Sequence, residues 1–197
     1  MNARSSEKPG IVLVPLAPGF EEIEAVAIID VLRRAGIEVR VAGLQPGPVT
    51  GSHGITLGTD VALDEVDPAL LAMIVLPGGQ PGSENLRKDG RVLALVRELA
   101  SSGRGVAAIC AAPTVLATAG VLDGKAATSH PSVRDRLAGA RVEPDRRVVR
   151  AGRVLTSQGA GTAIEFALEI VAELCGEAKA RELGAGMVVG SVAPVTR

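Results

Sequence analysis

Cys110 is the residue of this 197-residue chain whose type and position point most directly to chemistry. It follows the apolar run GVAAI (105–109) and precedes Pro113, a residue that the first turn of a helix accommodates well. A thiol at a strand-to-helix turn has the context of a nucleophile elbow, although the GxSxG pattern itself is absent. We expect the helix N-terminus to lower the pKa of this thiol and favour the thiolate. The alternative is a small core residue, because free cysteines are often buried, and position alone leaves both interpretations open.

Glu24 is the second candidate, because it lies early in a predicted helix at the same edge of the fold. The helix covers EEIEAVAIIDVLRRAG (21–36), in which Glu24 shares a face with Val31 and is expected to point inward. A buried carboxyl needs a partner or a raised pKa, and a raised pKa suits a proton shuttle. Its neighbours Glu21 and Glu22 are interpreted as partners of the positive end of the helix dipole.

Two backbone amides complete the predicted site. Gly79 follows Gly78 at the end of the apolar run MIVLP (73–77), and Ala111 follows the cysteine. Their N–H groups could form an oxyanion hole for charge that develops on a substrate oxygen. A Gly-Gly pair is also what a tight turn with positive φ requires, and alone it favours that structural interpretation.

Two polar loops supply weaker candidates. His130 lies in TSHP (128–131) and is interpreted as a third catalytic group or as an ordinary loop residue, whereas His53 alone indicates little. The segment QGAGT (158–162) opens a predicted helix and resembles a phosphate-binding loop. It lacks the GxGxxG spacing and the lysine of a P-loop, so we interpret it as structural.

The elements that must position these residues alternate between apolar strands and amphipathic helices. Continuous apolar runs are typical of parallel strands that are covered on both faces. A strand, a helix and a second strand within about 35 residues form the unit of a doubly wound α/β domain, in which ligands bind beyond the carboxyl ends of the strands. The predicted strands are 11–17, 37–44, 73–77 and 105–110, and the predicted helices are 21–36, 84–102, 113–120, 161–176 and 177–184.

Further features complete this outline. A hairpin or an edge excursion is predicted over 49–63, and a hairpin with Ala-Gly at its turn over 142–157. Since no repeat or linker is evident, we predict a single domain over residues 1–197, with residues 1–9 as a flexible polar tail. In the first helix, the apolar residues that recur at helical spacing are Ile23, Val26, Ile29, Val31 and Leu32.

Composition argues against several classes of function. The net charge is −1 and aromatic residues make up 1%, so no nucleic acid is expected as a stable partner. The longest uncharged window (105–122) contains a proline and no Trp or Tyr for an interfacial belt, which favours a buried strand and helix over a membrane span. Two histidines and two cysteines without CxxC spacing form no recognisable zinc motif, and we expect no metal or cofactor. Without an export signal, a cytoplasmic location with free thiols is expected.

Six stretches, in order along almost the whole chain, match a known family: GFEEIEAV (19–26), DVLRRAGIEVRVAGL (30–44), VLPGGQPGSENL (75–86), AAICAAPTVLA (107–117), TSHP (128–131) and LTSQGAGTAIEFALEIV (155–171). On these stretches the chain resembles the DJ-1/ThiJ/PfpI superfamily, most closely its DJ-1 (ThiJ/YajL-like) branch. The resemblance implies an α/β fold, a flavodoxin-like three-layer sandwich with a mostly parallel central sheet, and a homodimer.

The resemblance also implies roles for the site residues. Cys110 matches the reactive cysteine on a strained turn, and Glu24 matches the glutamate that hydrogen-bonds it and shares its proton. His130 matches a nearby histidine that in the family is often poorly aligned for a triad, and Gly79 and Ala111 match backbone donors around the cysteine. Ala111 stands where the protease-like branch has a histidine, which argues against peptidase chemistry. No histidine follows His130, as the class I glutamine amidotransferase pattern would require.

Other departures from the family concern the surroundings of the site. His53 stands where several relatives carry an arginine near the dimer interface and the site. Gly51 and Gly58 stand where animal members carry further cysteines, so redox behaviour that relies on those thiols is not expected here.

The function implied by the resemblance is cofactor-free, cysteine-dependent chemistry in defence against carbonyl and oxidative stress. Its substrate would be an α-oxoaldehyde, as in the glyoxalase III conversion of methylglyoxal to lactate, or a glycated protein or nucleotide. Cys110 would attack the aldehyde carbon, and Glu24 would move protons between carbon and oxygen. The alternative is a non-enzymatic redox sensor or chaperone whose Cys110 is oxidised to a sulfinate.

Overall fold

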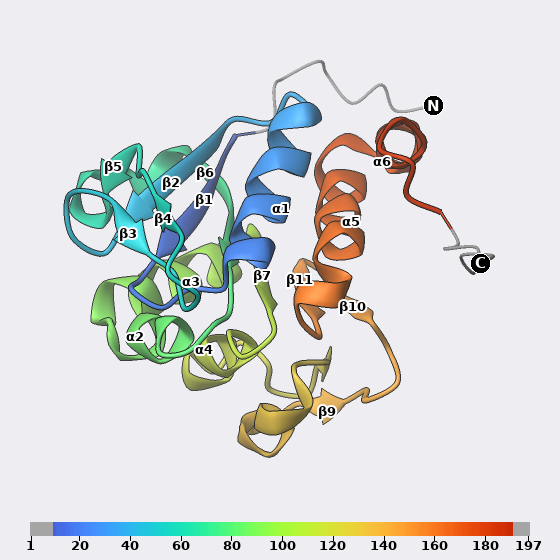
Figure 1. Cartoon of the computed structure of the whole chain (residues 1–197). Coiled ribbons are helices and arrows are strands. Elements are labelled where there is room, and N and C mark those ends of the chain that lie inside the picture. The colour runs from blue at the N-terminus through green and yellow to red at the C-terminus, as the bar shows by residue number, and fades with distance from the viewer. Residues whose placement is uncertain (1–9, 191–197) are drawn as a thin grey trace, which may run out of the picture.

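The computed structural model describes residues 10–190, and its centre is a seven-stranded sheet (Figure 1). The strands lie in the order β10-β11-β7-β6-β1-β2-β5, and all neighbours pair in parallel except β10 and β11. The predicted polar tail, residues 1–9, lies outside the described residues. The strands of this sheet are β1 (Ile11–Leu16), β2 (Val39–Gly43), β5 (Val61–Ala62), β6 (Leu71–Leu76), β7 (Gly105–Ile109), β10 (Val148–Ala151) and β11 (Val154–Ser157).

Helices cover both faces of this sheet, and each face has its own apolar cluster. One layer consists of α1 (Glu22–Arg34), α5 (Ala163–Cys175) and α6 (Glu177–Gly186), with α1 and α5 side by side (Figure 1). The opposite layer consists of α2 (Gly82–Lys88), α3 (Gly90–Ser101) and α4 (Pro113–Thr118). The fold is therefore the expected flavodoxin-like three-layer α/β sandwich with a mostly parallel central sheet.

Smaller elements fill the connections. The strands β3 (Val49–Thr50) and β4 (Thr56–Leu57) form an antiparallel hairpin, which confirms the expectation for 49–63, and β8 (Ala126–Ala127) pairs in parallel with β9 (Arg141–Val142). Four short 3-10 helices are η1 (Leu63–Glu65), η2 (Pro68–Leu70), η3 (Pro131–Arg136) and η4 (Ala160–Thr162).

The single helix predicted over 84–102 is wrong, because two helices, α2 and α3, meet at Asp89. The backbone of Asp89 is extended, with ψ 113°, and its carboxylate accepts the N–H of Arg91 at 2.9 Å as the N-cap of α3. Asp-Gly at this position is a start signal that the apolar periodicity did not reveal. The hairpin turn predicted at Ala-Gly also moves by one residue, because Ala151 pairs with Val154 and the turn is Gly152–Arg153.

Helix α1 buries only part of the set singled out by spacing, because Val31 and Leu32 are buried but Ile23 and Val26 are not. Ile23 and Val26 are 61% and 45% exposed. Glu24 lies fully buried on the opposite side, as predicted, and Gly36 ends the helix with φ +79°. The apolar residues that α1 turns to the core are Ala25, Ile28, Val31 and Leu32.

The uncharged window 105–122 becomes strand β7, a turn and helix α4, as expected. Among residues 10–190, no helix combines the length and the apolar character that crossing a membrane requires.

Candidate active site

Cys110 lies at the carboxyl edge of the sheet, on the turn between β7 and α4. Its φ is +64°, a left-handed conformation that costs a non-glycine residue about 1–2 kcal/mol. Two hydrogen bonds hold this conformation: the Cys110 N–H donates to the carbonyl of Ser157 at 3.0 Å, and its carbonyl accepts the N–H of His130 at 2.8 Å. The backbone of Cys110 is thus held in place, and the residue is partly exposed.

The carboxyl of Glu24 lies against this sulfur. Its Oε2 accepts the N–H of Gly78 at 2.8 Å, while Oε1 is buried and makes no hydrogen bond of good geometry within the described part of the chain, so it remains available to the nearby thiol of Cys110. Burial, and to a smaller extent the negative charge of Glu21, outweigh the hydrogen bonds from Gly78 and Cys110 and raise the pKa of Glu24 to about 7. A carboxyl that is half-protonated near neutral pH can both donate and accept a proton.

The thiol of Cys110 does not have the lowered pKa that its position in the sequence predicted. Burial, followed by the charge and hydrogen bond of Glu24, raises the pKa of Cys110 to about 12, although the N–H groups of Gly79 and Ala111 act in the opposite direction. Burial is the largest effect that opposes the thiolate, and the negative charge of Glu24 is the next largest. Protonation of Glu24 removes that charge. The two groups therefore titrate as a pair that shares a proton.

Gly78 and Gly79 form a tight turn that packs directly against the cysteine. A Cβ atom at Gly78 would lie 2.6 Å from the Cβ of Cys110 and 2.8 Å from Oε2 of Glu24, so only glycine fits between these groups. Gly79 has φ +91°, as a tight turn requires, and its N–H is directed at the sulfur together with that of Ala111. Both amides that the sequence singled out therefore lie at the cysteine, and their role as donors to a substrate oxygen stays a prediction.

His130 lies beside the cysteine, but its ring is turned toward Ser132. Its Nδ1 is 2.8 Å from the hydroxyl of Ser132 and accepts the N–H of the same residue at 3.3 Å. Because Nδ1 is an acceptor, the neutral ring carries its proton on Nε2. Among residues 10–190, the ring makes no hydrogen bond to Cys110 or Glu24. The three residues are brought together without forming a hydrogen-bonded triad.

Glu22 has a role that the sequence did not reveal. Its side chain is only 4% exposed, and it accepts the N–H of His53 at 2.6 Å and contacts Nδ1 of that ring at 2.9 Å. The hydroxyl of Ser52 and the N–H of Ile55 donate to the same carboxylate at 3.3 and 3.4 Å. Glu22 therefore clamps the β3–β4 loop onto the start of α1, where we had expected only a helix-dipole partner.

The electrostatics of this clamp follow from its hydrogen bonds. Burial opposes ionisation of Glu22, but the bonds from the side chain and backbone of His53 outweigh it and lower the pKa of Glu22 to about 2. The bond to Glu22 in turn raises the pKa of His53.

Within the described residues, one ligand atom each of Glu21, Glu22 and His53 lie within 4.8 Å of one another, close enough to hold a metal. The carboxylate of Glu22 is already saturated by the loop, which explains the cluster as a structural contact.

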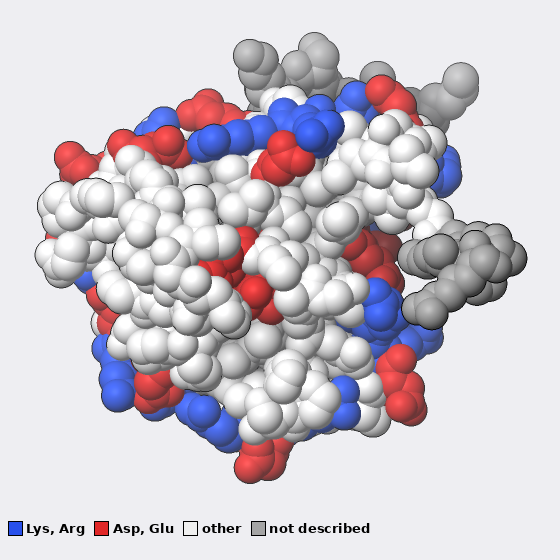
Figure 2. Space-filling view, viewed as in Figure 1, with Lys and Arg blue, Asp and Glu red and all other residues white. Residues whose placement is uncertain are grey.

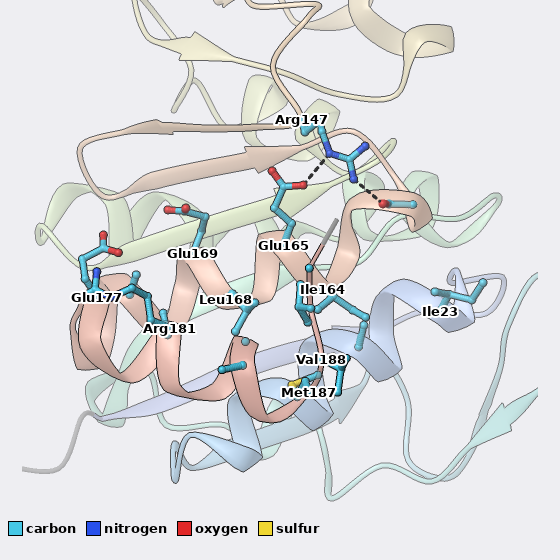
Figure 3. Close-up of a pocket in the computed structure, with 18 of the residues that line it drawn as sticks. Ile23, Arg147, Ile164, Glu165, Leu168, Glu169, Glu177, Arg181, Met187 and Val188 are labelled. Atoms are coloured by element: carbon cyan, nitrogen blue, oxygen red, sulfur yellow. Dashed lines mark hydrogen bonds and ion pairs between the residues drawn. The ribbon is translucent and has the colours of Figure 1, made fainter. Parts of the chain in front are cut away.

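The surface around α1 is largely uncharged. Figure 2 shows charged side chains mainly around the rim of this face, with acidic side chains recessed near its middle. A pocket between α1, α5 and α6 opens on the same side, and Ile164, Leu168 and Met187 are among its apolar lining (Figure 3). The ion pair of Arg147 and Glu165 lies at one end of this pocket. Cys110, Glu24 and His130 do not line this pocket, so it is separate from the candidate active site.

Comparison with known proteins gives consistent results over most of the chain. The family model described as the DJ-1/PfpI family matches residues 11–173. Protein dj-1beta of Drosophila melanogaster is 46% identical over 179 residues, which cover 90% of this chain and 96% of that protein. A protein named Deglycase TK1284, from Thermococcus kodakarensis, is 37% identical over 161 residues, 81% of this chain and 96% of its own length. The chain spans 45% of Protein DJ-1 homolog A of Arabidopsis thaliana, at 42% identity over 175 residues.

Solved structures show the same similarity. The crystal structure of Drosophila melanogaster DJ-1beta matches with a TM-score of 0.89 at 45% identity, over 92% of this chain and 98% of that one. The structure named "Toxoplasma gondii DJ-1, oxidized" matches with a TM-score of 0.86 at 38% identity, over 91% and 98%.

Proposed function

Because this chain belongs to the DJ-1/PfpI family, we propose that it is a cysteine-dependent enzyme that acts on α-oxoaldehydes or on the glycated groups they form. The observation that carries the proposal is the placement of Cys110, a partly exposed thiol on a strained turn, against a buried Glu24 whose pKa is about 7. The relative named a deglycase supports chemistry of this kind within the family.

The geometry suggests how methylglyoxal would react. As the sulfur of Cys110 bonds to the aldehyde carbon, the C=O π electrons move to oxygen, which receives the thiol proton by way of Glu24. The N–H groups of Gly79 and Ala111 stabilise charge on that oxygen during the step. The carboxylate of Glu24 then removes the proton from the hemithioacetal carbon, and the former ketone oxygen becomes the second oxygen of an enediol. Return of a proton to the neighbouring carbon, with transfer of the hydroxyl proton from the first oxygen to the second, gives a thioester of lactate. Water cleaves the resulting thioester, which releases lactate and restores the thiol.

A direct test is lactate formation from methylglyoxal without glutathione. The wild type and Cys175→Ser, which removes the exposed second thiol, are expected to form lactate at similar rates. Cys110→Ser is expected to lose about 10³-fold or more in kcat/KM, because the nucleophile is removed. Lactate formation that does not depend on Cys110 would overturn the proposal.

Glu24→Gln tests the proton shuttle separately from the nucleophile. The amide can still accept the N–H of Gly78, but it cannot move a proton, so turnover is expected to fall by about 10²–10⁴-fold. Alkylation of Cys110 by iodoacetamide should continue in this variant, which would show that the thiol is still presented. Turnover that survives this substitution would rule out the mechanism described above.

A second candidate is a redox sensor in which Cys110 is oxidised to a sulfinate. It is favoured by the accessible sulfur with two amide donors, and one similar structure is that of an oxidized DJ-1. Mild peroxide should then add two oxygen atoms to the peptide that contains Cys110 and none to the Cys175 peptide. If the wild type forms no lactate but shows this selective oxidation, the sensor is the better assignment.

We also propose that the chain forms a homodimer through its uncharged face. Exposed apolar side chains on α1, α5 and the β3–β4 loop gather there, namely Ile23, Val26, Ile55 and Ile164. Light scattering is expected to give twice the chain mass of 20.0 kDa, and Ile23→Glu is expected to reduce it to one chain mass. Leu70→Glu changes a similarly exposed residue on η2 and serves as the control. A wild type that stays monomeric at micromolar concentration would contradict this assignment.

A further inference from the structure

Gly159, in the loop after β11, faces all three residues of the candidate active site. A Cβ atom built on it would lie 3.7 Å from Cδ2 of His130, 3.9 Å from Oε1 of Glu24 and 4.0 Å from Sγ of Cys110. These are ordinary van der Waals distances, so a methyl group would fit there without collision. It would, however, occupy the space directly beside the sulfur.

The position of Gly159 is fixed by its neighbours. Its N–H donates to the hydroxyl of Thr162 at 3.1 Å, and its carbonyl accepts both the hydroxyl and the N–H of Thr162 at 2.8 Å. The preceding residues are held as well, since the carbonyl of Ser157 accepts the N–H of Cys110 and the amide of Gln158 donates to Pro144. A side chain added at 159 would therefore not be accommodated by movement of the loop.

The backbone of Gly159 does not explain why a glycine is present. Its φ is 160°, which is extended backbone that other residues also adopt. The feature that distinguishes glycine here is the room that it leaves beside Cys110, Glu24 and His130. The sequence QGAGT resembled a phosphate loop, but its first glycine faces the cysteine.

We propose that Gly159 sets the size of the group that the site accepts beside the reacting carbonyl. The space left by the absent side chain would receive the substituent R of an α-oxoaldehyde R–CO–CHO. The site would therefore accept substituents larger than hydrogen. This inference rests on the proposed function for its substrate class, whereas the space itself is a property of the thiol's surroundings.

The inference is tested by measuring kcat/KM for α-oxoaldehydes of increasing size. The variants compared are Gly159→Ala and the matched control Gly161→Ala. Gly161 lies two residues away in the same loop, and a Cβ atom there meets nothing within 4 Å. For Gly159→Ala, kcat/KM is expected to fall about 10- to 100-fold with tert-butylglyoxal and less than about threefold with glyoxal. Methylglyoxal should be intermediate, and Gly161→Ala should match the wild type with all three.

Alkylation of Cys110 tests the space even if no aldehyde is turned over. In a Cys175→Ser background with Gly159 unchanged, the rates at which Cys110 reacts with iodoacetamide and with N-benzyliodoacetamide are expected to differ by less than about tenfold. Gly159→Ala should slow only the reaction with the larger reagent, N-benzyliodoacetamide. The inference is overturned if the wild type already rejects the larger reagent, or if Gly159→Ala slows both reagents equally or behaves as Gly161→Ala does. Absence of lactate with selective slowing of the larger reagent would refute the proposed function and support the role of Gly159.

Discussion

The backbone N–H of His130 donates a 2.8 Å hydrogen bond to the carbonyl oxygen of Cys110, and this contact, rather than the imidazole, joins the histidine to the cysteine. The ring instead accepts a hydrogen bond from Ser132. Together with the bond from Cys110 to Ser157, the contact fixes the positive φ on which the thiol is presented. A residue can thus be needed at this position for its main chain while its side chain contributes little.

His130→Ala is therefore expected to lower kcat/KM for methylglyoxal by less than about tenfold, because the backbone bond to Cys110 remains and the ring is hydrogen-bonded to neither Cys110 nor Glu24. Ser132→Ala, which removes the hydroxyl contact to Nδ1 but keeps the backbone N–H, is the control and should have a smaller effect. A loss of about 100-fold or more in His130→Ala would show that the ring takes part in proton transfer.

Glu24 is expected to make stability depend on pH. Its pKa rises from 4.5 in the unfolded chain to about 7 in the fold, so the folded state binds this proton more tightly. The stability gained from the proton is fully present below pH 4.5 and is lost as the pH rises to 7, to the extent of about 3 kcal/mol. Glu24→Gln should therefore be more stable than the wild type at pH 8 and nearly equal to it at pH 4.5.

Urea unfolding at both pH values measures this difference. Glu182→Gln, on the exposed side of α6, is the control and should follow the wild type at both. The raised pKa of Glu24 would be contradicted if the free energies of unfolding of Glu24→Gln and the wild type differed by the same amount at pH 4.5 and pH 8.

Gly78→Ala should disrupt the site by overlap, since its Cβ would lie 2.6 Å from that of Cys110. We expect a loss of about 1–3 kcal/mol in the free energy of unfolding and a large loss of turnover, because either Cys110 or Glu24 must move. Gly58→Ala, where nothing lies within 4 Å, should change stability by less than about 0.5 kcal/mol. Equal stability of the two variants would argue against the close approach at Gly78.

The clamp between Glu22 and the β3–β4 loop predicts a different dependence on pH. Glu22→Ala leaves the N–H groups of His53 and Ile55 without their acceptor and should cost about 1–3 kcal/mol. The stabilisation by Glu22, whose pKa is lowered to about 2, is present above pH 4.5 and is lost as the pH falls from there. The stabilisation that comes from the charged form of His53 is present below pH 6.5 and is lost as the pH rises through the raised pKa of His53.

The cost of Glu22→Ala should therefore be largest between about pH 4.5 and 6.5, as measured by urea unfolding across the pH range. His53→Ala keeps the backbone N–H and should cost less, mainly in the same window. A cost of Glu22→Ala that does not vary between pH 3 and 9 would contradict the charged pair.

The sequence by itself determined the fold class and most of the candidate site. Continuous apolar runs separated by helical segments specify parallel strands covered on both faces, and such strands end at one edge. The residues that follow those runs, Gly78, Gly79 and Cys110, had to meet there, and Glu24 joins them from the first turns of α1. The fold and the positions of these residues could be predicted because they depend on local periodicity and on a general rule of sheet topology, whereas the roles of the residues stay predictions.

Only the tertiary structure decided the quantities that depend on distances between segments remote in the chain. The pKa of Cys110 is raised because burial and Glu24 outweigh two amides, and the balance of these effects cannot be read from the helix that follows the cysteine. The ring of His130 turns to Ser132, and Glu22 binds a loop 31 residues away, through contacts that no spacing encodes. Gly159 faces the thiol because the hydrogen bond between Cys110 and Ser157 sets β11 beside β7. Burial and orientation arise from packing, so they become defined only when the segments are assembled.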